Sequence, residues 1–194
     1  MGRTAKLTGE SVYLALASPE DAELWARWLN DLEVALPLGD EAYSLFTTED
    51  QARDIQDIIA HRDHVFTVVQ RATDRPIGRC LLFGLNKTDR STEVGIFIGE
   101  KDCWGKGYGT EAMRLLLDYA FNLLNLHSVM LGVYSFNDRA IRSYRSLGFQ
   151  EIGRRRQARI IGPRMFDVVL MDLLADEFES PVVQRLVANR DAVG

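Results

Sequence analysis

Apolar residues recur with two periods along this chain, and each change of period marks a new element. Residues 11–16 are strand-like, and Ser18, Pro19 and Asp21 then form a helix start, with Ser18 as N-cap and Asp21 closing a capping box. Apolar side chains at helical spacing continue to Leu29, so this first helix is amphipathic. Residues 31–46 contain proline, glycine and mixed charges, and we expect them to form a long loop.

Strand patterns dominate the middle of the chain. A second helix, capped by Thr47 or Thr48 and running to about Arg62, precedes three strand-like segments at residues 65–69, 78–85 and 92–98. A glycine-rich loop and a helix with one apolar face come next. That face consists of Ala112, Met113, Leu116, Leu117, Ala120, Leu123 and Leu124.

The rest of the chain alternates the two kinds of element once more. Residues 128–134 are apolar on both sides, as in a buried central strand, and a helix at 137–147 precedes strands at 150–160 and 165–173. The order predicts one mixed α/β sheet of about seven strands with helices on both faces. We expect a single domain at 1–174 and a tail at 175–194. The tail is predicted to form a short helix that packs on a second subunit of a homodimer or frays.

Composition and charge narrow the class of protein. Hydrophobic residues make up 46% and charged residues 26% of the chain, as in ordinary globular domains. The net charge of −5 argues against a nucleic-acid partner, because phosphate contacts need a basic face. No apolar run approaches the ~18 residues of a membrane span, and residues 1–9 lack the apolar core of a signal peptide. We therefore expect a cytoplasmic protein without a membrane partner. Cys80 and Cys103 are predicted to be reduced, partly buried thiols.

The glycine-rich loop at 103–110 is the first sign of chemistry. Gly105, Gly107 and Gly109 leave the backbone bare, so its N–H groups can approach an anion, and the helix that follows points its positive dipole end at the same place. The spacing fails the dinucleotide pattern G-x-G-x-x-G at its third glycine, and the Gly-Lys-Ser/Thr ending of a nucleoside-triphosphate loop is absent. By itself the loop indicates an anion site or a plain structural turn.

Two segments together carry a family resemblance. They are Trp-Gly-Lys-Gly-Tyr-Gly-Thr-Glu-Ala at 104–112 and Asn-Asp-Arg-Ala-Ile-Arg-Ser-Tyr-Arg-Ser-Leu-Gly-Phe at 137–149. Both resemble the signature segments of the GNAT superfamily of acetyl-CoA-dependent N-acetyltransferases, and most of all its RimJ/RimL-like branch and the spermidine N-acetyltransferases. The resemblance covers about residues 8–174 and implies a GNAT-like, mostly antiparallel sheet. Trp104 departs from the Gln or Arg that many members carry there.

The resemblance implies contacts to acetyl-CoA as the acyl donor. The backbone of residues 104–110 would hold the pyrophosphate, with Lys106 as an added charge. The strand that ends at Ile98 would pair with the pantetheine arm and offer an N–H group to the thioester carbonyl. No metal is implied. The cofactor residues assigned in this way are Phe97, Ile98, Trp104, Gly105, Lys106, Gly107, Tyr108, Gly109, Thr110, Asn137 and Ala140.

Two residues are candidates for catalysis. Tyr144 lies two helical turns after Asn137, on the same face, and is either a core aromatic or the proton donor to the departing thiolate. The second role suits a phenol, whose ordinary pKa of ~10 lies above the ~8.5 of a thiol. Asn137 is either a helix N-cap alone or also a contact to the pantetheine arm. Glu93 precedes the cofactor strand, where the similar branch carries an acid. It is either a base acting through water or a carboxylate facing solvent.

A structural interpretation is favoured for two further groups. His61 and His64 are three apart but lack other ligands, so a solvated helix end is favoured over a metal site. For the three arginines at 154–156, a solvated strand edge is favoured over contact with the 3′-phosphate of coenzyme A.

The predicted function is acetyl transfer to a primary amine, either small or peptidic, such as a protein N-terminal amine or a polyamine. The alternatives are an aminoglycoside-type antibiotic as acceptor, or a catalytically silent acyl-CoA-binding sensor domain. In the region where the family places its acceptor, Trp25 and Trp28 are expected in a helix core. Asp40 and Glu41 either face solvent or meet a cationic amine.

Overall fold

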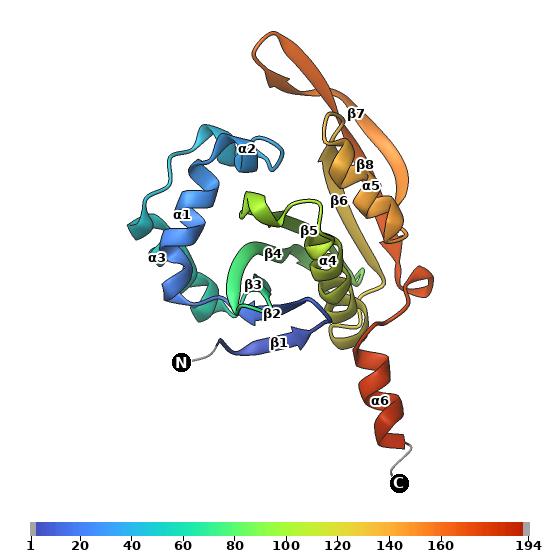
Figure 1. Cartoon of the computed structure of the whole chain (residues 1–194). Helices are drawn as coiled ribbons and strands as arrows, with labels where there is room; N and C mark the ends of the chain where they lie inside the picture. Colours follow the sequence, from blue (N-terminus) through green and yellow to red (C-terminus); the bar gives the residue numbers. More distant parts are fainter. Residues whose placement is uncertain (1–2, 192–194) are drawn as a thin grey trace.

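The fold is a single twisted sheet with helices on both sides, seen in a computed structural model that describes residues 3–191 (Figure 1). The strands follow one another in the order β1-β2-β3-β4-β5-β6-β8-β7, and every neighbouring pair is antiparallel except β5 and β6. The strands are β1 (Ala5–Thr8), β2 (Val12–Leu16), β3 (Val65–Gln70), β4 (Arg75–Asn86), β5 (Ser91–Ile98), β6 (Ser128–Tyr134), β7 (Gln150–Ile161) and β8 (Arg164–Leu174).

This architecture confirms the predicted fold class, with one strand more than expected. The additional strand, β1, is four residues long and lies at the edge of the sheet, and only its Leu7 is buried. So short a segment gives no visible alternation of apolar and polar residues, which is why the sequence pattern did not predict it.

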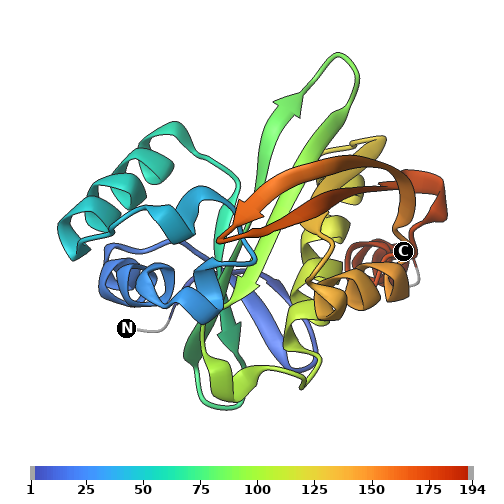
Figure 2. The same cartoon turned by 90° about the horizontal axis from the view of Figure 1, so that it is seen from above.

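Helices cover both faces, with α1–α3 on one side and α4 and α5 on the other (Figure 2), while α6 projects away from the sheet (Figure 1). The helices are α1 (Ala22–Asn30), α2 (Leu32–Ala35), α3 (Thr48–His61), α4 (Tyr108–Asp118), α5 (Asp138–Ser146) and α6 (Val183–Asp191). Shorter helical turns are η1 (Pro19–Asp21), η2 (Asp40–Tyr43), η3 (Lys101–Cys103), η5 (Ala175–Glu177) and the π-helical η4 (Tyr119–Leu123). Each face therefore has its own core, one around Trp25 and Trp28 of α1, as predicted, and one around Met113 and Leu116 of α4.

Two expected elements differ from the prediction. The segment 31–46 is not a plain loop but contains α2 and η2. The helix expected to continue to Leu124 widens after Asp118 into the π-helical turn η4, and Leu123, predicted on the apolar face, is 48% exposed. A π turn adds a residue to the helical repeat, so it rotates later side chains away from the face that the α-helical period predicts.

One buried carboxylate holds the start of α6 against the domain. Asp118, at the end of α4, is fully buried and accepts hydrogen bonds from Ser180 Oγ at 2.6 Å and from the backbone N–H groups of Val182 and Val183 at 2.9 and 3.0 Å. It thus supplies a charged acceptor at the start of α6, where helical N–H groups lack partners. The helix predicted after Pro181 is present.

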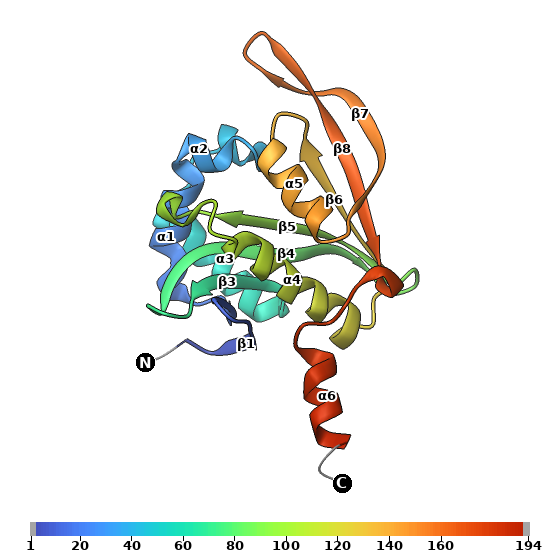
Figure 3. The same ribbon diagram turned by 45° about the vertical axis from the view of Figure 1, so that its right-hand side comes forward.

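The sheet divides between its two parallel strands. β5 and β6 pair only from Ser91 with Ser128 to Glu93 with Met130, and beyond that point each continues with its other neighbour. As a result, β6, β7 and β8 stand away from the rest of the sheet (Figure 3). In the part of the chain described, every helix is too short or too polar to cross a membrane.

Candidate active site

A cleft of about 850 Å³ opens where β5 and β6 separate. Its walls come from β5 with the start of α4, from β6 with α5, and from the segment around α2. The cleft is lined by all but one of the residues that the sequence assigned to acetyl-CoA or to catalysis. These are Glu93, Phe97, Ile98, Trp104, Gly105, Gly107, Tyr108, Gly109, Thr110, Asn137, Ala140 and Tyr144. The exception is Lys106, whose side chain is exposed. A contact from Lys106 to a bound phosphate stays a prediction.

The glycine loop presents bare backbone to the cleft. Gly105 and Gly107 have φ of 72° and 83°, in the left-handed region that favours glycine, and a Cβ on either would meet nothing within 4 Å. Gly107 is the N-cap of α4 and supplies no side chain to satisfy the first N–H groups of that helix. Open space, uncapped N–H groups and a helix N-terminus together fit an anionic group such as the pyrophosphate of coenzyme A.

Trp104 forms a rigid wall beside this loop. Its indole N–H donates to the carbonyl of Ile98 at 2.7 Å, which fixes the ring against the end of β5. The guanidinium of Arg139, on α5, stacks over the same ring at 4.3 Å from its centre. The two sides of the cleft therefore meet at this pair, and Arg139 adds a cation beside the glycine loop. Sequence reasoning missed Arg139, although it lies between Asn137 and Ala140 in the second signature segment.

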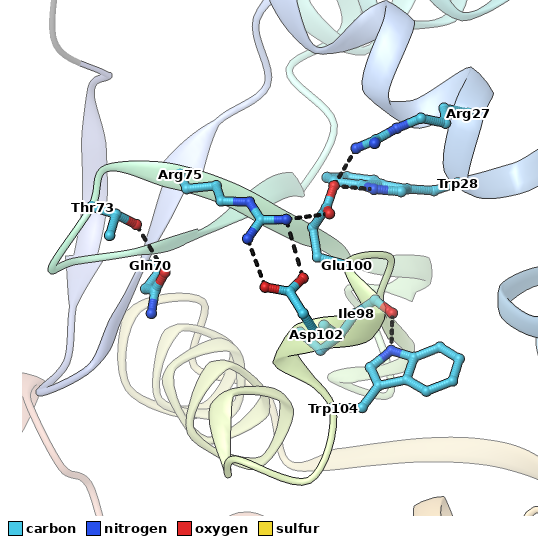
Figure 4. Close-up of polar contacts among 9 residues, drawn as sticks. All are labelled: Arg27, Trp28, Gln70, Thr73, Arg75, Ile98, Glu100, Asp102 and Trp104. Carbon is cyan, nitrogen blue, oxygen red and sulfur yellow. Dashed lines mark hydrogen bonds and ion pairs between the residues drawn. The ribbon is translucent and has the colours of Figure 1, made fainter.

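An ion-pair network anchors the segment that leads into the loop. Glu100, only 8% exposed, accepts a hydrogen bond from Trp28 Nε1 at 2.8 Å and also binds Arg27 and Arg75 (Figure 4). Arg75 also binds Asp102, and these hydrogen bonds hold the pKa of Asp102 below its ordinary value. The network ties the end of β5 to α1 and β4, so it positions the segment that leads into the glycine loop.

We expect Glu100→Gln to lower the free energy of unfolding by about 2 kcal/mol, because an uncharged amide cannot replace a buried carboxylate between two arginines. Urea unfolding followed by fluorescence measures the change. Asp102→Asn is the matched control: it removes a pair whose carboxylate is 59% exposed, and it should leave the urea midpoint unchanged. Equal losses in the two variants would contradict a central role for Glu100.

Helix α5 carries the candidate proton donor. Asn137 caps it by accepting a hydrogen bond from the N–H of Ala140 at 3.2 Å, while lining the cleft. Thr110 of α4 and Ser143 of α5 share a hydrogen bond of 2.8 Å between their hydroxyls, which joins the two helices. Tyr144 packs edge-on against Phe149, and burial raises its pKa to about 12. A phenol with such a pKa is protonated at every physiological pH.

Glu93 and Tyr144 approach the cleft from opposite faces of the sheet. Along β5, Glu93 shares its face with Phe97, whose ring meets Trp28 of α1 edge-on at 6.1 Å between centres. Tyr144 instead packs against the core beneath α4. Among the described residues the carboxylate of Glu93 has no hydrogen bond or ion pair. Because β5 and β6 separate directly after Glu93, side chains from both faces of the sheet can line the same cleft.

The α1–α3 side of the cleft holds charges that the sequence only partly indicated. Glu41 lines it, and so do Glu33, which binds Lys101 at 2.6 Å, and Arg79. Burial lowers the pKa of Arg79, against the effect of the nearby carboxylates of Glu41 and Asp54. Glu33 and Arg79 have no motif around them, so only the packing of α2 and β4 could reveal them.

The β7–β8 hairpin closes over this side (Figure 2). Arg159 of β7 binds Asp40 at 3.0 Å and the carbonyl of Gly39, and it stacks over the rings of Tyr43 and Tyr134. The hydroxyl of Tyr43 donates to the carbonyl of Ile160 at 3.1 Å. Asp40 therefore has a structural partner, whereas Glu41 faces the cleft.

The remaining predictions have mixed outcomes. Cys80 and Cys103 are free thiols, as predicted, and both are buried. Of residues 154–156, Arg154 binds Glu151 at 2.6 Å on the edge strand β7, but Arg155 lines the cleft. His61 is exposed at the end of α3, whereas His64 is not solvated as expected: it is half-buried, with Nδ1 3.0 Å from the hydroxyl of Tyr119. Residues 3–191 contain no cluster of three or more His, Cys, Asp or Glu that could hold a metal.

Comparison with known proteins shows the family of the chain. The family described as Acetyltransferase (GNAT) domain matches residues 12–150. The chain is 30% identical to an uncharacterized N-acetyltransferase of Bacillus licheniformis over 82% of its length and 90% of that protein. It is 30% identical to spermidine N(1)-acetyltransferase of Escherichia coli (strain K12), over 75% of this chain and 76% of that one. The structure of spermidine N-acetyltransferase from Vibrio cholerae with CoA and spermine is 26% identical. It superposes with a TM-score of 0.79 over 87% of this chain and 98% of that one. The chain therefore belongs to the GNAT family of acetyltransferases and is an N-acetyltransferase.

Proposed function

We propose that this N-acetyltransferase moves an acetyl group directly from acetyl-CoA to a primary amine of a small molecule or peptide. The observation that carries the proposal is the single cleft where β5 and β6 separate, with uncapped helix N–H groups and Tyr144 on one side and the carboxylates of Glu41 and Glu93 on the other. An anionic donor and a cationic acceptor fit these two sides. The spermidine acetyltransferases among its relatives place polyamines among the acceptors to test.

Acetyl-CoA supplies the acetyl group as a thioester when it is bound. The α4 N-terminus and the glycine loop would hold its pyrophosphate, and the unpaired edge of β5 beyond Glu93 offers backbone groups to its pantetheine arm, as a sheet edge does to an added strand. The carbonyl of Ile98 is already bound by Trp104, so the donors and acceptors left along this edge lie before it.

The residues present favour direct transfer over an acetylated enzyme. The amine nitrogen would attack the thioester carbonyl and lose a proton toward Glu93. As the carbon–sulfur bond breaks, the sulfur would share the hydroxyl proton of Tyr144, and proton exchange with water would release coenzyme A as the free thiol and restore both residues. Cys103 lines the cleft and is the thiol that could act as a nucleophile there. Desolvation raises its pKa, which keeps it in the unreactive thiol form.

An amine panel tests the proposal. The purified protein is incubated with acetyl-CoA and with spermidine, peptides bearing free N-terminal amines, or aminoglycosides, while thiol release and the mass of the product are followed. We expect thiol release in proportion to an acetylated amine for at least one class. Binding of acetyl-CoA by calorimetry without transfer to any amine would instead favour the sensor domain.

The role of Glu93 has its own expected result. A primary alkylamine with a pKa of ~10.4 is almost fully protonated at pH 7, so loss of a base in Glu93→Gln should lower kcat/KM there by about 30-fold. As the pH approaches the pKa of the amine, free amine accumulates and the difference should vanish. An acceptor with an α-amine, whose pKa is near ~8, is the internal control, and its kcat/KM should fall less. A variant with an unaltered pH–rate profile would exclude Glu93 as the base.

A further inference from the structure

Arg79 lies at the centre of the acceptor side of the cleft. It is on β4, directly across from Thr67 on β3 and Phe97 on β5, and its side chain extends toward α1. The guanidinium stacks over the rings of Trp25 at 4.8 Å and Phe97 at 5.4 Å. It lines both the cleft and an adjoining hollow of about 510 Å³ between α1, η2 and α3.

This guanidinium has no polar partner within the described chain. Its Nε is enclosed and makes no hydrogen bond, and no carboxylate of residues 3–191 approaches it closely enough for an ion pair. Arg139 and Arg155 also line the cleft and have no ion pair among the described residues, but both are exposed to solvent, whereas the Nε of Arg79 is enclosed. Arg79 is part-buried, and aromatic stacking uses the face of the guanidinium and not its N–H donors, so these donors stay available to an anionic ligand in the cleft.

The nearest carboxylates do not supply that ligand. Glu41 and Asp54 act on the charge of Arg79 from a distance, but Asp54 accepts a hydrogen bond from Gln51 at 2.9 Å instead. On the same face of the sheet, the neighbours of Arg79 toward the reaction centre are Leu81 and Phe83 of β4. Carboxylates line the adjoining hollow, but on the side toward the reaction centre Arg79 is a cation next to apolar residues, with its donors unused, as in a recognition group.

We propose that Arg79 binds an oxyanion, a carboxylate or a phosphate, carried by the same acceptor molecule whose primary amine is acetylated. The proposal rests on the proposed function, since it assigns a second group to the same acceptor. Arg79 pairs with Phe97, and Glu93 lies four residues earlier on the same face of β5, about 13 Å away along the strand. The acceptor is then a zwitterion, with its amine toward Glu93 and its oxyanion toward Arg79. A polyamine would bring a second cation to Arg79 instead.

Matched acceptors test this inference directly. Lysine and cadaverine differ only in a carboxylate, and β-alanine with its longer ω-amino homologues can be compared with the corresponding alkylamines. Aminoalkyl phosphates of the same lengths distinguish phosphate from carboxylate. For at least one length we expect kcat/KM to favour the oxyanion-bearing acceptor by at least about tenfold, as for one charge-assisted hydrogen-bonded contact.

Substitution of Arg79 should remove that preference. Arg79→Met keeps the length and apolar stem of the side chain, and should lower kcat/KM about tenfold more for the oxyanion-bearing acceptor than for the matched plain amine. Arg79→Lys keeps the charge and should retain part of the preference. Melting temperature and acetyl-CoA affinity, measured for each variant, report on the fold and the donor site, and both should be unchanged. If Arg79→Met does not fold, the comparison of Arg79→Lys with the wild type replaces it.

The outcomes separate this inference from the proposed function. If plain amines are acetylated as well as every oxyanion-bearing homologue, and the Arg79 variants change both series equally, the assignment to Arg79 is overturned while amine acetylation stands. If acetyl-CoA binds but no amine of either series is acetylated, the proposed function itself fails.

Discussion

We expect Tyr144→Phe to lower kcat by about 100-fold while leaving the KM for acetyl-CoA nearly unchanged, since general acid catalysis contributes at least that factor. The substitution removes one hydroxyl and keeps the ring, so the edge-on packing against Phe149 is preserved. Steady-state rates with the best acceptor of the panel, together with calorimetric titration of acetyl-CoA, separate turnover from binding. A variant that turns over at the wild-type rate would make Tyr144 a core aromatic only.

The pKa of Tyr144 shapes how this acid acts. At about 12, it lies above the ~8.5 of an ordinary thiol, so complete proton transfer to a free thiolate in water would be uphill by about 5 kcal/mol. The burial that raises the pKa of the phenol also raises that of a thiol beside it, because both anions lose water. We therefore expect a shared proton that stabilises the sulfur as the bond breaks.

The pH–rate profile offers a second test of the same residue. Because Tyr144 ionises only around pH 12, the wild-type rate should rise with deprotonation of the amine and show no falling limb from Tyr144 below about pH 11. A falling limb between pH 8 and 10 that disappears in Tyr144→Phe would contradict the raised pKa. A limb that persists in the variant would belong to another group.

The donor side of the cleft could be predicted from the sequence because its chemistry is local. Gly105 and Gly107 adopt left-handed conformations within one short loop, and α4 begins directly after it, so sequential neighbours would form the proposed anion site. Tyr144 follows from the same logic, since helical spacing fixes its position relative to Asn137. Predictions of this kind do not depend on how distant strands pair.

The acceptor side could not be predicted, because it is made by packing between distant segments. Arg79 becomes a cleft residue only when β4 lies beside β5 and α1 packs over both, and Glu33 only when α2 turns back toward η3. The separation of β5 and β6 after Glu93 arises because β6 goes on pairing with β8 and no longer with β5. This pairing depends on several segments and cannot be read from any one of them. Trp104 shows the same limit: its hydrogen bond to Ile98 requires the turn η3 between them.

Gly107→Ala should weaken acetyl-CoA binding by about 100-fold, because the added methyl group would prevent one or two charge-assisted hydrogen bonds to the phosphate. This is the largest effect that we expect from the addition of one carbon atom. The new Cβ would meet no protein atom within 4 Å, so it would project into the open space in front of the α4 N-terminus. A phosphate could then no longer reach the backbone N–H groups. Calorimetry with acetyl-CoA measures the loss.

Gly162→Ala is the matched control for this substitution. Gly162 also has a positive φ, 56° against 83° at Gly107, and also has nothing within 4 Å of an added Cβ, but it lies in the β7–β8 turn away from the cleft. Both variants should lose comparable stability from a left-handed alanine, about 1 kcal/mol. Only Gly107→Ala should bind acetyl-CoA more weakly. The two positions have similar backbone strain, but Gly107 faces the cleft and Gly162 does not. Equal affinity in both variants would mean that the loop is a structural turn and that the anion binds elsewhere.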